Sequence, residues 1–140
     1  MREFDFYLRE KKVKKVSPDI ELAKSLVKDS DERINAIKLL DTKILKKIIF
    51  ENVYDSMRAL LDALLAADGY KSYSHEASIA YLKRYGLDDF TLTNLDNFRF
   101  DRNSSKYYGK GISQDSVEEI LAFYNKFAVK IKKILDKKLK

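Results

Sequence analysis

The chain has 140 residues, 45% hydrophobic and 36% charged, and a formal net charge of +6 at pH 7. This length suits one domain with a single core, and the composition is typical of a folded protein. The absence of cysteine excludes disulfides, zinc–thiolate sites and thiol nucleophiles. No apolar run approaches the roughly 18 residues of a membrane-spanning helix, and no signal-peptide segment is visible. We therefore expect a cytoplasmic protein that does not bind membranes.

Positive charge is concentrated at the two ends of the chain. Residues 126–140 hold seven lysines against one acid, Asp136, and residues 1–16 hold six basic side chains against three acidic ones. Such ends attract phosphates or acidic partners, or they serve as solubilising tails. With four glycines and one proline, the sequence has few of the turn-forming residues that an all-β fold needs.

Residues 1–16 show no sustained helical period, which predicts a basic N-terminal arm or a short edge element before a bundle of residues 17–140. The first helix start is Ser17-Pro18-Asp19, with an N-cap hydroxyl, a proline suited to the first helical position and an acid in the first turn. Apolar residues at helical spacing then predict a helix over about 18–40, with a candidate break at 29–31.

The strongest helical pattern runs from about Lys43 to Asp68, with Gly69 as its left-handed C-cap. Its apolar residues have the three- and four-residue spacing of a wide buried stripe. The stripe consists of Ile44, Leu45, Ile48, Ile49, Val53, Met57, Leu60, Leu61, Leu64 and Leu65. At about 1.5 Å per residue this helix is about 40 Å long, so we expect it to form the centre of the bundle.

Three further helices are predicted. The first covers residues 74–86 and has Ser74 as its N-cap, the second covers about 93–106, and the last begins near Ser113 or Asp115. The expected fold is all-α, an up-and-down bundle of about five helices.

The central helix carries four charged residues at spacings of four, three and four, which place them on one face. They are Glu51, Asp55, Arg58 and Asp62. This face is either solvated and held by i,i+4 ion pairs, or it contains acids that fix the arginines of a neighbouring helix. In the second interpretation, Glu51 and Asp55 hold those arginines across a groove.

The fourth predicted helix contains Arg99 and Arg102, one turn apart, followed by Asn103, Tyr107 and Tyr108. Two arginines with nearby tyrosines could clamp a phosphate and stack a base. The alternative is a pair of surface arginines beside tyrosines that complete the core.

The only histidine, His75, falls in the first turn of the third predicted helix. The positive end of the helix dipole disfavours an imidazolium there, so we expect a neutral structural histidine. One histidine without cysteines argues against a metal site, and no cofactor is expected.

Three features in this order resemble the HEPN (higher eukaryote and prokaryote nucleotide-binding) domain family. They are the long helix with the segment ENVYDSMRALL from Glu51, the short helix opening at Ser74-His75, and Arg102-Asn103 before Tyr107. The resemblance covers roughly residues 17–138. It extends to small, stand-alone archaeal members with a similar basic N-terminal arm.

The resemblance implies a helical bundle that forms a homodimer. Many family members are metal-independent ribonucleases, often toxins paired with a small nucleotidyltransferase. Their site is an arginine followed four to six residues later by a histidine, contributed by both protomers at a dimer groove. Arg102 matches the arginine and Asn103 the polar residue after it, but Tyr107 or Tyr108 stands where the histidine would be.

The absence of the family's histidine determines which function we expect. RNA cleavage without a metal needs a base and an acid, and imidazole serves as both near neutrality. A tyrosine phenol in water, with a pKa of about 10, is a poor base at pH 7, and losing one proton-transfer partner lowers the rate by about 10² to 10⁴. We therefore expect a homodimer that binds RNA or a nucleotide phosphate without efficient cleavage. Its binding residues would be Arg99, Arg102, Asn103, Tyr107 and Tyr108.

Other functions remain open. One is a weak ribonuclease in which Arg102 stabilises the phosphorane and Tyr107 donates a proton. Another is an interaction subunit for a nucleotidyltransferase partner, and a third is purely structural dimerisation. Dimerisation itself is predicted because one small core cannot readily hide all of the aromatic residues near the fourth helix, which are Phe98, Phe100, Tyr107 and Tyr108.

Overall fold

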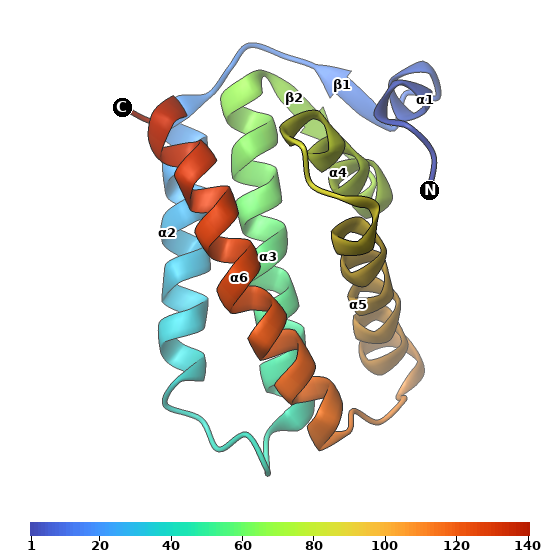
Figure 1. Cartoon of the computed structure of the whole chain (residues 1–140), viewed down its shortest axis with the longest axis vertical. Coiled ribbons are helices and arrows are strands. Elements are labelled where there is room, and N and C mark those ends of the chain that lie inside the picture. The colour runs from blue at the N-terminus through green and yellow to red at the C-terminus, as the bar shows by residue number, and fades with distance from the viewer.

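The long helix α3, Lys46–Asp68, lies at the centre of the structure, and the other long helices pack around it (Figure 1). The computed structural model describes residues 1–140. The other elements are α1 (Phe4–Arg9), β1 (Val13–Lys15), α2 (Ile20–Ile37), β2 (Tyr70–Ser72), α4 (His75–Tyr81), the 3₁₀ helix η1 (Leu82–Tyr85), α5 (Asp89–Tyr108) and α6 (Gln114–Lys138). The all-α bundle is confirmed, with a small two-stranded sheet added to it.

The helix α3 forms much of the core because its apolar side chains extend around most of its circumference. Fourteen of its 23 residues are buried. The predicted stripe is wrong only at its start, where Ile44 and Ile48 are exposed and the helix begins at Lys46 rather than Lys43. Gly69 ends the helix in the left-handed region as predicted, with φ of +86°.

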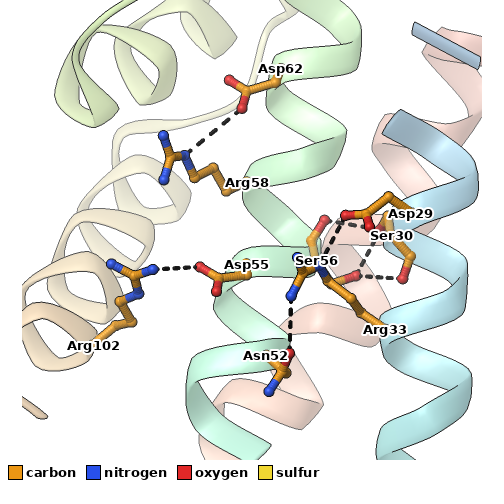
Figure 2. Close-up of polar contacts among 9 residues, drawn as sticks. All are labelled: Asp29, Ser30, Arg33, Asn52, Asp55, Ser56, Arg58, Asp62 and Arg102. Carbon is orange, nitrogen blue, oxygen red and sulfur yellow. Dashed lines mark hydrogen bonds and ion pairs between the residues drawn. The ribbon is translucent and has the colours of Figure 1, made fainter. Parts of the chain in front are cut away.

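The helix α2 runs beside α3 without interruption, so the candidate break at 29–31 is wrong. Ser30 is buried at this point, and its Oγ lies 2.7 Å from Oγ of Ser56 on α3 (Figure 2). Each hydroxyl also lies 2.9 Å from the backbone carbonyl oxygen of the other serine. The N-cap is Asp19 rather than Ser17, because the Asp19 carboxylate accepts the backbone N–H of Leu22.

Residues 1–16 fold onto the bundle. Strand β1 pairs antiparallel with β2, with Val13 opposite Ser72, which confirms an edge element. The six-residue helix α1 was not predicted, because it is shorter than two turns and shows no repeat. Phe4, Tyr7 and Val13 from this segment are buried in the core.

The remaining helix ends follow side-chain caps. Ser74 is the N-cap of α4, as predicted, and of the two candidate starts for the last helix Ser113 is the N-cap of α6. The helix α5 begins earlier than expected, at Asp89, because Asp88 accepts the backbone N–H of Thr91 at 2.8 Å. No helix is both long and apolar enough to cross a bilayer.

The arrangement of helices around α3 positions the candidate site. The helix α2 lies on one side of α3, and α4 and α5 lie on the other (Figure 1). Because α4 and α5 both contact α3, side chains from three separate stretches of the chain meet on that side.

Candidate functional site

Arg102 lies at the centre of the predicted site, on the side of α5 that faces α3 (Figure 2). Only 4% of the residue is exposed. Its Nη2 donates to Oδ1 of Asp55 at 3.0 Å, and its Nη1 donates to Oδ1 of Asn103 at 3.2 Å. The Nε atom is buried without a hydrogen-bond partner. The site therefore holds a fixed guanidinium whose Nε–H has no hydrogen-bond partner.

The guanidinium of Arg102 also contacts two tyrosine rings. Its Cζ lies 5.9 Å from the ring centre of Tyr54 and 5.9 Å from that of Tyr107. Tyr54 is buried, whereas Tyr107 is 62% exposed and Tyr108 is 85% exposed. The two tyrosines at the end of α5 therefore do not complete the core. They form an aromatic surface above a buried cation.

Of the two acids expected to hold arginines, one does so. Asp55 forms the ion pair with Arg102 across the α3–α5 contact. Glu51 makes no ion pair with either arginine, and its Oε1 lies 3.5 Å from Oγ of Ser105, which is buried. The supporting role expected for Glu51 is therefore wrong in this form, because α5 presents a serine to it.

Arg99 does not point the same way as Arg102, although it lies one turn earlier. Its Nε donates to Oδ1 of Asp96 on its own helix at 2.8 Å, and its Nη2 lies 3.7 Å from Oε1 of Glu76 on α4. The expected clamp of two parallel arginines is wrong. One arginine faces α3 and the other faces α4.

His75, for which the sequence predicts a structural role, lies next to this site. Its ring centre is 6.4 Å from that of Tyr54, on which Arg102 also packs. Burial, together with the charges of Arg58, Arg102 and Arg99, lowers the pKa of His75 to about 4. The imidazole is therefore neutral at pH 7, as expected. No residue spacing indicated its proximity, since only the packing of α4 on α3 brings it there.

Two more charged groups occupy the same side of α3. Arg58 and Asp62 form an i,i+4 pair with Nε and Oδ2 3.8 Å apart, and they lie on the flank that carries Asp55 (Figure 2). Burial raises the pKa of Asp62 to about 6, against the opposing charge of Arg58. The face that carries Glu51, Asp55, Arg58 and Asp62 is thus half-buried rather than fully solvated.

Two exposed lysines flank the exposed tyrosines in the sequence. Lys106 is exposed, with Nζ 5.8 Å from the ring centre of Tyr107, and Lys110 follows the left-handed Gly109 that ends α5. The end of α5 therefore combines two exposed rings with exposed cations. This set of groups can stack planar molecules and attract anions.

No group of three or more histidine and carboxylate side chains is placed to hold a metal ion. The functional groups present in this region are one neutral imidazole, three arginines paired with carboxylates, and the aromatic surface at the end of α5. No protein-family model matches the chain, and no curated protein matches it.

Proposed function

We propose that the chain is a HEPN-like homodimeric module that binds RNA or a nucleotide phosphate at the C-terminal end of α5. One observation carries this proposal: Tyr107 and Tyr108 are exposed among lysines, with the guanidinium of Arg102 beneath the ring of Tyr107. Aromatic faces that stack bases, beside cations that hold phosphates, are the features by which proteins bind single-stranded nucleic acid.

Arg102 and the surface cations have different roles in this proposal. Arg102 is buried and bonded to Asp55, so it orients Tyr107 and adds positive potential from below. The phosphate contacts come from Lys106 and Lys110, which are exposed. Arg99 is half-buried between α5 and α4, where it is already paired with Asp96 and Glu76.

The same geometry supports binding better than cleavage. A tyrosine phenol is a poor base near neutrality, and an efficient general base has a pKa near the working pH. His75 is unprotonated at pH 7, but its pKa of about 4 makes it a weak base. A metal-independent ribonuclease using Arg102 is the second candidate, supported by the position of His75 beside Tyr54. A nucleotidyltransferase partner rests on the resemblance alone.

The homodimer in this proposal forms through the outer face of α5. Besides Tyr107 and Tyr108, which bind RNA in this proposal, α5 exposes two large hydrophobic side chains, Phe90 and Phe100. Phe98, which was expected to contribute, instead belongs to the core. Asn97 and Ser104, one turn before and one turn after Phe100, are uncharged, and exposed aromatic groups are typical of interfaces. We place the contact around Phe100.

Fluorescence anisotropy with labelled single-stranded RNA, in EDTA and at low salt, tests the binding proposal. Tyr107→Ala/Tyr108→Ala should weaken binding about tenfold or more, because each stacked base contributes about 1–3 kcal/mol. Tyr73→Ala is the control, since Tyr73 is also 61% exposed and lies within cation–π distance of Lys71. No binding by the wild-type protein would refute the proposal. Cleavage in EDTA that His75→Gln abolishes would favour the ribonuclease instead.

A further inference from the structure

The opposite end of α5 forms a second aromatic and basic surface, together with α6. A hollow of about 230 Å³ lies between the start of α5 and the middle of α6. Phe90 and Phe123 line it, together with Lys126 and Lys130. Phe90 is 76% exposed, so a large apolar area of its side chain contacts water where α5 and α6 border the hollow.

The inner wall of this hollow is held rigidly by the core. The ring of Phe123 stacks on Phe127 with centres 5.7 Å apart and planes at 19°. It also meets Phe98 edge-on, with centres 5.2 Å apart. Phe127 and Phe98 are both buried, so Phe123 presents a fixed aromatic wall to the hollow.

The lysines of the hollow continue along α6 as a stripe with spacings of four, three and four, which is one helix face. The stripe is Lys126, Lys130, Lys133 and Lys137. All four lysines are exposed and none forms an ion pair. Two other lysines of α6, Lys132 and Lys138, are instead bonded to Asp31 and Asp68. The stripe therefore leaves four cations without protein partners.

We propose that the hollow takes one base of a single-stranded RNA whose phosphates follow the lysine stripe of α6. This inference rests on the proposed function and extends it, because it selects a polynucleotide over a mononucleotide. Charge complementarity identifies the occupant: four unpaired lysines in a row suit a polyanion, and the rings of Phe90 and Phe123 suit the face of a base.

The two surfaces lie at opposite ends of one helix. From position 90 to position 107, α5 rises about 26 Å. An RNA strand that contacts both the hollow and the Tyr107 surface must therefore be several nucleotides long. A mononucleotide is too short to reach both surfaces.

Anisotropy titration of the full-length protein with a labelled 20-nucleotide oligouridine tests the inference. Phe90→Ala should raise Kd about 5- to 100-fold at fixed salt, through loss of one stacked base. Lys126→Gln/Lys130→Gln should reduce the slope of log Kd against log salt by about 1.4, because each phosphate contact with a single strand contributes about 0.7. Lys24→Gln/Lys28→Gln removes two exposed lysines with the same spacing from α2 and should leave the slope unchanged.

The remaining outcomes separate this inference from the proposed function. An unchanged Kd for Phe90→Ala, with weaker binding by Tyr107→Ala/Tyr108→Ala, overturns the hollow site and leaves the proposed function standing. No RNA binding by the wild-type protein overturns both. If the Phe90 and lysine variants lose binding only to phosphatidylserine vesicles, the hollow belongs to an anionic membrane surface and the RNA assignment is wrong. Since Phe90 is exposed, thermal unfolding of its variant should match wild type.

Discussion

At the scale of single residues, Arg102 is the side chain on which the geometry of the site depends. It is nearly fully buried, and its ion pair with Asp55 joins α5 to α3. Arg102→Ala should lower the free energy of unfolding by roughly 2–4 kcal/mol, because it leaves a half-buried carboxylate without its partner. Urea unfolding measures this change.

A double variant and a neighbouring arginine provide the controls. Arg102→Met/Asp55→Leu should recover much of the loss, because it removes both charges and keeps apolar volume. Arg99→Ala should lower the unfolding free energy by only about 1 kcal/mol, since its carboxylate partners, Asp96 and Glu76, are more exposed. Equal losses for Arg102→Ala and Arg99→Ala would contradict the view of Arg102 as the buried centre.

His75 and Asp62 should respond to pH in opposite directions. Burial lowers the pKa of His75 from 6.5 to about 4, so its contribution to stability is complete above pH 6.5 and is lost as pH falls toward 4. Burial raises the pKa of Asp62 from 3.8 to about 6, so stability is lost as pH rises from 4 to 6. The two effects oppose each other in the wild-type protein.

Single substitutions separate these effects in urea unfolding between pH 4 and 7. With His75→Gln, the free energy of unfolding should fall as pH rises from 4 to 6. With Asp62→Asn, it should instead rise between pH 4 and 6.5. Parallel pH profiles for the two variants would show that these groups are not buried as described.

Helical spacing and residue type predicted part of the candidate site at this scale, since they indicated the pairing of Arg102 with Asp55. The partners of Arg99 and the proximity of His75 were not found. They depend on how α4 packs against α5 and α3, and helical spacing describes only one helix at a time.

At the scale of elements, the two left-handed glycines that end α3 and α5 differ in their surroundings. Gly69 has φ of +86°, and a Cβ there would lie 2.7 Å from the backbone oxygen of Val16. Gly109 has φ of +69° and open space around it. Both alanine variants carry backbone strain of about 1–2 kcal/mol, but Gly69→Ala also displaces the segment that leads into α2.

We therefore expect Gly69→Ala to lower the unfolding free energy more than Gly109→Ala does. Thermal or urea unfolding of the two variants gives the comparison. Equal losses would mean that the close approach of Val16 to the end of α3 is easily relaxed.

The elements that the sequence predicted are those with local signals. Gly69, Ser74 and Ser113 mark helix ends through their own conformation or side chains, and these three boundaries are confirmed. The strands β1 and β2 have three residues each and pair across more than fifty positions, so no local period reveals them. The helix likewise continues through Ser30 because the Ser30 hydroxyl bonds to Ser56 on another helix, and a pattern within one helix does not reveal that contact.

At the scale of the whole molecule, the outer face of α5 should hold two copies together. Phe100→Glu should convert the dimer to a monomer in light scattering at micromolar concentration, because a charge on a desolvated contact is costly. Leu39→Glu is the matched control, since Leu39 is an exposed apolar residue in the α2–α3 connection. A monomeric wild-type protein would refute the proposed homodimer.

The central claim is that the end of α5 contacts RNA, and NMR tests it most directly. Uniformly ¹⁵N-labelled protein is titrated with single-stranded oligouridine, and amide shifts are followed residue by residue. We expect the largest changes around Tyr107, Tyr108 and Lys110, with smaller ones at Phe90 and along the lysine stripe. An unchanged spectrum at saturating RNA, or changes confined to α2, would contradict the claim.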